Sequence, residues 1–187
     1  DRLERGETMD DLPCLYRREG GKPRKETSFP YLFPDRSKVD RYRSRYYYMF
    51  HRNCSLIKTS FGCPYQCAFC FCRQITDGGY FARDLENVIA ELKTVKETEI
   101  YIVDDDFLVD RERILEFTRL LKENHIKKRY LIYGRADFIA ANEDVIRAFQ
   151  KAGLRAVIVG LESCDSRELK DYRKMTQVAV NEKAVRI

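Results

Sequence analysis

Short apolar runs alternate with amphipathic segments from Ser55 onward. After Arg83, apolar residues repeat every three or four positions, which is helical spacing with one buried face. The runs between such segments are rich in branched and aromatic residues, as strands are. This alternation is typical of βα units on a parallel sheet, so the sequence predicts an α/β fold. The predicted strands are SLIKTS from Ser55, EIYIV from Glu99, RYLIYG from Arg129 and LRAVIVG from Leu154.

Capping residues mark the predicted helices. Asp110 suffices to begin the second helix, and Asn142 can cap the third, which Gly153 stops. Asp165 and Glu168 resemble a capping box at the start of a fourth helix. Four strand–helix units leave an open sheet, because a closed barrel of this kind has eight. We therefore expect an open sheet with free edges.

The first fifty residues show no regular period. Four prolines break any helix there, and Gly20–Gly21 is placed where a hairpin could turn. The stretch ends in the basic and aromatic run RYRSRYYYMFHR, from Arg41 to Arg52. We predict an irregular connector or arm over residues 1–53 and a core domain over residues 54–187.

Composition and charge narrow the function classes. Apolar residues make up 44% of the chain and aromatic residues 12%, which is enough for a packed interior. The net charge of +5 arises before Phe61, where 14 basic residues face 9 acidic ones. Because this excess is small, the tyrosines of RYRSRYYYMFHR are expected to pack on a barrel or another domain rather than bind RNA. No apolar run nears the roughly 18 residues of a membrane span, and the opening lacks the apolar region of a secretory signal, so a cytoplasmic location is expected.

Three of the seven cysteines are packed into CPYQCAFC. An odd count with such clustering favours metal ligation over a disulfide framework. Cys63, Cys67 and Cys70 follow the first predicted strand, where active-site loops of parallel βα folds emerge. Such a loop can place three thiolates on three irons of a cubane cluster, which leaves the fourth iron open to an outside molecule.

Zinc is the structural alternative for these thiols. A zinc site needs four closed ligands, usually in two separated pairs, whereas this chain has one compact set. Cys54 or Cys72 could complete the site, but Cys72 lies only two residues after Cys70. The cysteines outside the compact set are scattered, which argues against a second cluster; they are Cys14, Cys54, Cys72 and Cys164.

CPYQCAFC, with Phe69 in its aromatic position, resembles the C-x-x-x-C-x-aromatic-C motif of radical S-adenosylmethionine (radical SAM) enzymes. The resemblance implies a partial (βα) barrel of six units, of which this chain holds about four and is truncated at its C-terminal end. It also implies a 4Fe-4S cluster on Cys63, Cys67 and Cys70, whose open iron binds S-adenosylmethionine and cleaves it reductively.

Further segments resemble the cobalamin-dependent branch of that family. They are VDDDF, YGRADFIA, GLES and LKDYRK, and the segment from Asp10 to Asp40 resembles the connector that follows a cobalamin-binding domain. The D-x-H-x-x-G motif of that domain does not occur in this chain, so cobalamin would be held by a domain outside it. The family's Gly-Gly-Glu motif is replaced by the acidic run.

The resemblance also implies contacts to S-adenosylmethionine. Asp104 and Asp105 would accept hydrogen bonds from its amino group, and Arg135 would hold its carboxylate. The structural alternatives are a helix cap or solvated turn for the aspartates and a surface pair with Asp137 for Arg135. Asp106 is less favoured, because Asp110 already begins the next helix. The remaining implied contacts are Phe69 beside adenine, Glu162 and Ser163 at the ribose hydroxyls, and Lys174 in the fourth helix.

Phe69 has core packing as its alternative, and Lys174 has simple solvation. As a whole, the resemblance implies an enzyme, either a cobalamin-dependent methyltransferase or an anaerobic oxidoreductase or cyclase. It implies a small-molecule or peptide substrate and an external electron donor like flavodoxin or ferredoxin. An RNA-modifying enzyme of the methylthiotransferase kind is the alternative within enzymes, and a non-catalytic iron–sulfur or zinc protein is the alternative outside them.

Overall fold

The computed structural model describes residues 4–7 and 31–187. The chain divides into two compact units, Asp1–Leu32 and Phe33–Ile187, and the second unit carries the fold described below. The predicted turn at Gly20–Gly21 and the cysteine Cys14 lie outside the described residues. The predicted domain boundary after residue 53 stays a prediction.

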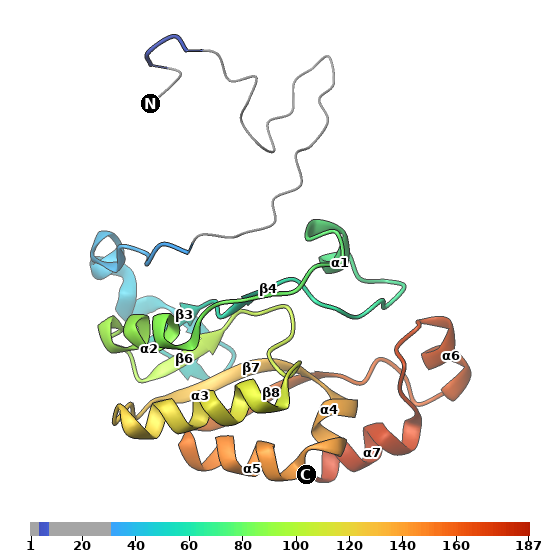
Figure 1. Cartoon of the computed structure of the whole chain (residues 1–187). Coiled ribbons are helices and arrows are strands. Elements are labelled where there is room, and N and C mark those ends of the chain that lie inside the picture. Colours follow the sequence, from blue (N-terminus) through green and yellow to red (C-terminus); the bar gives the residue numbers. More distant parts are fainter. Residues whose placement is uncertain (1–3, 8–30) are drawn as a thin grey trace. The chain divides into compact units, whose positions relative to one another are not determined.

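A parallel sheet of four strands organises the second unit (Figure 1). Its strand order is β3-β6-β7-β8, with β3 and β8 at the edges. The α/β prediction and the four predicted strands are confirmed. The bounds are β3 Cys54–Ile57, β6 Glu99–Ile102, β7 Arg129–Arg135 and β8 Leu154–Gly160.

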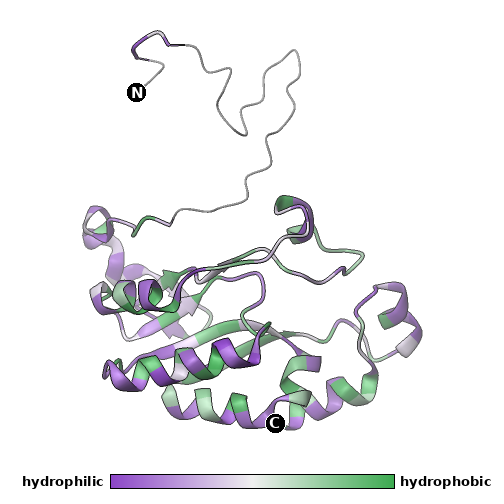
Figure 2. Ribbon diagram, in the orientation of Figure 1, coloured by the Kyte–Doolittle hydropathy of each residue, from purple (hydrophilic) through white to green (hydrophobic). Residues whose placement is uncertain are grey.

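One face of the sheet is covered by helices. The core on this side combines strand residues such as Ile100 and Ile102 with helix residues such as Phe117 and Phe149. Figure 2 shows the helices with alternating green and purple segments, as expected for an apolar face turned to the core. The covering helices are α2 Leu85–Thr94, α3 Arg111–Glu123 and α5 Glu143–Ala152.

The opposite face carries a smaller apolar cluster. Cys54, Tyr101 and Leu131 form its buried centre, with partly buried tyrosines, valine, alanine and isoleucine around it. Alternation along each strand separates these residues from those of the main core. No helix among the described residues is long and apolar enough to cross a membrane.

Helix caps agree with the prediction only in part. Asp110 accepts a hydrogen bond from the Arg113 amide at 3.1 Å, and Gly153 ends α5 with a φ of 126°, so both predicted boundaries are confirmed. Asn142 precedes α5, but its side chain does not cap it. Its Nδ2 instead donates to the Phe138 carbonyl at 2.9 Å, because Asn142 also closes the short helix α4 (Ala136–Ala141), which the sequence did not predict.

The predicted capping box at the fourth helix is only half formed. Asp165 accepts a hydrogen bond from the Arg167 amide at 2.7 Å at the start of α6 (Ser166–Asp171). Glu168 does not return to the Asp165 amide, because its carboxylate accepts from the Ser163 hydroxyl. A further helix, α7 (Val178–Arg186), follows.

The segment before the sheet is more regular than predicted. It forms a 3-10 helix, η1 (Arg36–Arg45), and a hairpin of β1 (Tyr47–Tyr48) and β2 (His51–Arg52). The expectation of irregular structure was therefore wrong here. Tyr48 stacks on Tyr101 with ring centroids 4.5 Å apart, and its hydroxyl lies 3.3 Å from that of Tyr133. This contact agrees with tyrosines that pack on the sheet.

The first predicted strand ends early. Ile57 is its last residue, and Ser60–Phe61 forms a separate strand, β4, antiparallel to β5 (Phe81–Ala82). The physical reason is that the Thr59 amide donates to the Asp104 carboxylate instead of to a neighbouring strand. The chain is thereby turned away from the sheet and into the cysteine loop.

Candidate functional site

The cysteine loop lies between β4 and the short helix α1 (Cys72–Ile75). Its three thiols, those of Cys63, Cys67 and Cys70, are free and half-buried. The Ala68 amide donates to the Tyr172 carbonyl at 2.8 Å, which fixes the loop to the end of α6. Figure 1 shows α1 and α6 beyond the same ends of the parallel strands. The loop therefore stands at the carboxyl edge of the sheet.

The position just before the first loop cysteine requires a glycine. Gly62 has a φ of 81°, and a Cβ there would lie 2.1 Å from the Gly79 carbonyl oxygen. Its amide donates to the Asp105 carboxylate at 2.9 Å. Asp105 thus holds the loop where it leaves β4.

The thiols fit an iron–sulfur cluster by donor type. Burial raises the pKa of Cys63 to about 11, and smaller contributions come from the charges of Asp106, Cys67 and Cys70. A thiol with so high a pKa stays protonated at neutral pH, so a metal would displace its proton on binding. Among the residues that the structure describes, no three His, Cys, Asp or Glu side chains are already assembled as a metal site.

Asp104 ties two strand ends together. Its carboxylate accepts hydrogen bonds from the Thr59 amide at 2.6 Å and from the hydroxyls of Thr59 and Ser60 at 2.5 and 2.8 Å. Burial raises its pKa, and these bonds oppose the rise. Asp104 is therefore neither a helix cap nor a solvated residue. Its predicted contact with S-adenosylmethionine stays a prediction.

Asp106 is the acidic residue whose bonding is incomplete. Its Oδ1 accepts from the Leu108 amide at 3.0 Å, while its buried Oδ2 has no hydrogen-bond partner. Burial raises its pKa from 3.8 to about 7, and Arg135 and Lys174 lower it by smaller amounts. A buried acceptor without a donor is costly and is often found at functional sites. Asp106 is less favoured than its neighbours from the sequence, because Asp110 suffices to begin the next helix, and no local pattern shows which of three successive aspartates is buried.

The raised pKa of Asp106 predicts how pH changes stability. The folded state keeps this proton up to about pH 7, while the unfolded state loses it near 3.8, so stability contributed by the group falls as pH rises between these values. Asp106→Asn should therefore stabilise the metal-free protein relative to wild type at pH 8, by at most about 4 kcal/mol, and not at pH 4. Urea unfolding across this pH range measures the difference.

Asp144→Asn is the opposite-sign control. Arg111 lowers the pKa of Asp144 from 3.8 to about 2. The stability that this ion pair contributes is therefore present above pH 3.8 and is lost as the pH falls toward 2. If the difference in unfolding free energy between wild type and Asp106→Asn did not change from pH 4 to pH 8, the raised pKa of Asp106 would be refuted.

Arg135 joins three parts of the site. Its Nε lies 2.9 Å from Asp137 Oδ1, its Nη2 donates to the Lys174 carbonyl, and its guanidinium carbon lies 3.9 Å from the Tyr65 ring centroid. Its Nη1 is 3.6 Å from the Cys67 sulfur. The pair with Asp137 exists, but Arg135 is buried, so the alternative of a surface pair is wrong.

Glu162 and Lys174 form a pair beside Arg135. Glu162 Oε1 lies 2.9 Å from Lys174 Nζ, at a position where Glu162 has a φ of 64°. Lys174 lies after α6, which ends at Asp171, and not within the fourth helix as expected. It is buried, so the alternative of a solvated lysine is wrong. Its Nζ lies 5.9 Å from the ring centroid of Phe69, which packs edge-on against Tyr172. Phe69 is 54% exposed and is not a core residue.

The structure thus gathers most of the predicted site residues but not all. The cysteine loop, Arg135 and Lys174 are in contact, and Glu162 is joined to them through Lys174. Ser163 instead bonds to Glu168 and to the Asp165 amide in the α6 cap. Tyr65, Asp106 and Asp137 are site residues that the sequence did not favour, because their positions depend on tertiary packing.

These features define an α/β domain with thiols, carboxylates and a buried guanidinium at the carboxyl edge of a parallel sheet. The family model of the radical SAM superfamily matches residues 57–187. The chain belongs to this superfamily, and the resemblance stated from CPYQCAFC is confirmed.

The chain is similar to curated proteins of the superfamily. It is 28% identical to the hopanoid C-3 methylase of Methylococcus capsulatus, over 78% of this chain and 28% of that protein. It is 27% identical to the anaerobic magnesium-protoporphyrin IX monomethyl ester cyclase of Cereibacter sphaeroides, over 67% of this chain and 21% of that protein. The chain therefore spans less than a third of the length of these two relatives.

Solved structures share the fold. The cobalamin-dependent S-adenosylmethionine radical enzyme OxsB, with aqua-cobalamin and S-adenosylmethionine bound, matches with a TM-score of 0.76 and 19% identity over 98% of this chain and 29% of that chain. The radical S-adenosylmethionine methyltransferase TsrM from Kitasatospora setae matches with a TM-score of 0.66 and 19% identity over 99% of this chain and 40% of that chain. The predicted partial βα barrel is confirmed by this agreement of fold.

Proposed function

We propose that this chain is the S-adenosylmethionine-cleaving domain of a radical enzyme, with Cys63, Cys67 and Cys70 as ligands of a 4Fe-4S cluster. The observation that carries the proposal is the set of three free, half-buried thiols at the carboxyl edge of the sheet in a chain of this superfamily. When bound, the cluster supplies the electron for reductive cleavage of S-adenosylmethionine.

The chain's own residues position and shield this site. Arg135 Nη1 lies 3.6 Å from the Cys67 sulfur, so the guanidinium holds that side chain of the loop in place. Asp105 holds the beginning of the loop, and the Tyr65 ring covers the guanidinium. These contacts support a loop that is oriented before the cluster is present.

The hydrogen bonds of the acidic run distinguish its members. Asp104 and Asp105 already accept bonds from Thr59, Ser60 and Gly62, whereas Oδ2 of Asp106 is buried without a donor. We therefore propose Asp106 as an additional acceptor for the amino group of S-adenosylmethionine. Arg135 for its carboxylate, Glu162 and Ser163 for its ribose, and Phe69 for its adenine remain proposals, as does Lys174.

The relatives favour one branch of the superfamily. The curated relatives include methylases and cyclases, and the solved neighbours are named as cobalamin-dependent or methyltransferase enzymes. We propose methyl transfer, or anaerobic oxidation or cyclisation, on a small molecule or peptide, with cobalamin held by a domain outside this chain. A flavodoxin-like or ferredoxin-like donor would supply the electron in the cytoplasm, where thiols stay reduced.

Oxygen-free reconstitution tests the proposal. Protein supplied with iron and sulfide should bind about four irons per chain and, after reduction, convert S-adenosylmethionine to 5'-deoxyadenosine and methionine. Iron analysis, electron paramagnetic resonance and chromatography of the products measure these outcomes. One tightly bound zinc per chain, with no iron uptake, would overturn the proposal.

A further inference from the structure

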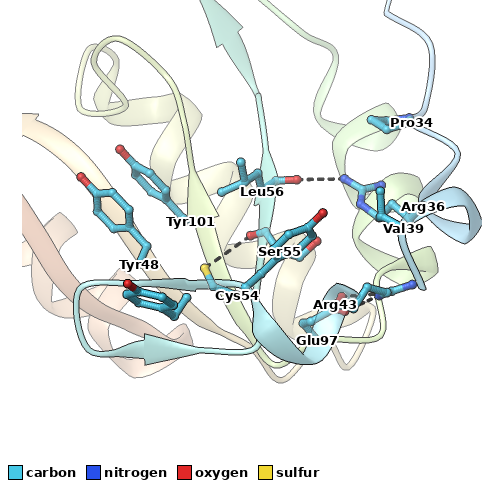
Figure 3. Close-up of a pocket in the computed structure, with 12 residues that line it drawn as sticks. Pro34, Arg36, Val39, Arg43, Tyr48, Cys54, Ser55, Leu56, Glu97 and Tyr101 are labelled. Atoms are coloured by element: carbon cyan, nitrogen blue, oxygen red, sulfur yellow. Dashed lines mark hydrogen bonds and ion pairs between the residues drawn. The ribbon is translucent and has the colours of Figure 1, made fainter. Parts of the chain in front are cut away.

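A cavity lies at the opposite half of the sheet from the cysteine loop. It has a volume of about 580 Å³ and opens between η1, the β1–β2 hairpin and the edge strand β3 (Figure 3). Cys54, which lines it, is the first residue of β3, and Glu97 precedes β6. The cysteine loop instead lies at the carboxyl edge of the sheet, and none of its residues lines the cavity. The two sites are therefore distinct.

Aromatic rings dominate the lining. The four tyrosines that contribute are Tyr46, Tyr47, Tyr48 and Tyr101. The rings of Tyr48 and Tyr101 are stacked at an interplanar angle of 20° and lie side by side in Figure 3. Tyr47 and Leu56 are 75% and 54% exposed, so apolar surface is presented to solvent at this cavity. Such surface favours a flat apolar ring that can stack and be desolvated.

The charged side chains in the lining already have partners. Arg43 makes a two-point contact with Glu97, with Nε–Oε1 and Nη2–Oε2 distances of 2.6 and 2.7 Å. Arg36 Nη2 lies 2.7 Å from Oε1 of the fully buried Glu91. Arg43 also lowers the pKa of Glu97, which keeps the pair ionised. Glu91 is shared with Arg83, and Arg43 pairs with Asp40 as well, so three guanidiniums balance three carboxylates. The described residues therefore offer a ligand little net charge.

Two backbone groups at the edge of β3 are already occupied, which disfavours an added strand. The Leu56 carbonyl accepts a hydrogen bond from Arg36 Nη2 at 2.9 Å, and the Cys54 amide donates to the Tyr46 carbonyl at 3.2 Å. A peptide that binds by strand addition needs such groups to be open. A small molecule that uses side-chain contacts does not.

We propose that this cavity binds an uncharged, ring-bearing apolar small molecule, which stacks on the tyrosines and is held by Leu56. The volume falls within the range of about 300 to 1,000 Å³ that is usual for small-molecule sites. The proposal does not depend on the cluster, because its lining residues and the cysteine loop are separate.

Two fluorescent probes that differ mainly in charge test the chemistry. N-phenyl-1-naphthylamine is neutral, and 1-anilinonaphthalene-8-sulfonate carries the same rings with a sulfonate. Titration of the whole chain should show saturable binding of the neutral probe and at least about fivefold weaker binding of the sulfonate, since both arginines are neutralised. Equal or tighter binding of the sulfonate would overturn the assignment of an uncharged ligand.

Variants at exposed positions locate the binding site without disturbing the core. Tyr47→Ala and Leu56→Ser should each weaken binding of the neutral probe about fivefold, the usual loss for one aromatic or apolar contact. Met49→Ala is the matched control, because Met49 is an exposed residue of the same hairpin turn that does not line the cavity. Loss of affinity in the control equal to that in Tyr47→Ala, or no loss in either lining variant, would place the probe elsewhere.

A gain-of-binding variant tests the charge argument independently. Glu97→Gln removes one negative charge from the lining and leaves Arg43 only its ion pair with the half-exposed Asp40. Binding of the sulfonated probe should then tighten about tenfold, while binding of the neutral probe stays within about twofold. If the sulfonate gains nothing, the internal neutralisation of the cavity is wrong.

Discussion

Replacement of Cys63, Cys67 or Cys70 by alanine should abolish iron binding after oxygen-free reconstitution. Each variant removes one of the three thiolates on the loop, and two thiolates cannot hold a cubane cluster whose open iron already lacks a protein ligand. The reductive cleavage of S-adenosylmethionine should disappear with the iron. Iron and sulfide analysis, with electron paramagnetic resonance of the reduced protein, measures the loss.

Cys164→Ala is the matched control for the loop cysteines. Cys164 is a free and exposed cysteine that belongs to the segment after β8, not to the loop. Its replacement should leave the iron content unchanged. If Cys164→Ala and Cys67→Ala lost iron equally, the assignment of ligands to the loop would be refuted.

Arg135→Leu should lower the free energy of unfolding of the metal-free protein by about 3 kcal/mol, the usual cost of breaking a buried ion pair. The variant loses the contacts to Asp137 and Lys174 together with the stacking on Tyr65. The loop should also become easier to cleave with protease, because Arg135 is one of its attachments. Urea unfolding and limited proteolysis measure the two effects.

Arg147→Leu provides the comparison for this variant. Arg147 pairs with Glu143 in α5 at a similar distance of 2.8 Å, but both side chains are about half exposed. Loss of this ion pair should lower the free energy of unfolding by less than about 0.5 kcal/mol, because solvent screens such a pair. Arg135→Lys should restore part of the stability and not the two-point contact with Asp137. Equal effects of Arg135→Leu and Arg147→Leu would mean that Arg135 does not anchor the site.

Local patterns predicted the sheet and its main helices because each element carries its own periodicity. All four positions of β6 within the run EIYIV are buried. Asp110 begins its helix with a side-chain cap and Gly153 ends its helix with a positive φ, and both effects are local. CPYQCAFC was recognisable for a related reason, since the ligand spacing lies within one loop.

Contacts between residues distant in the sequence determine the features that local patterns did not predict. Thr59 leaves the strand because Asp104, far along the chain, accepts its amide, and η1 is fixed by Arg43 to Glu97. The burial of Asp106 and the approach of Tyr65 to Arg135 likewise depend on how the loop folds back. Such contacts join residues that no local pattern connects.

The hydrogen bonds that Thr59 and Ser60 donate to Asp104 fix the segment that precedes the cysteine loop. Because these hydrogen bonds join protein atoms alone, they persist when iron is lost to oxygen. Damage by air should then stay confined to the loop, and repair should need a thiol reductant with fresh iron and sulfide rather than refolding of the whole domain.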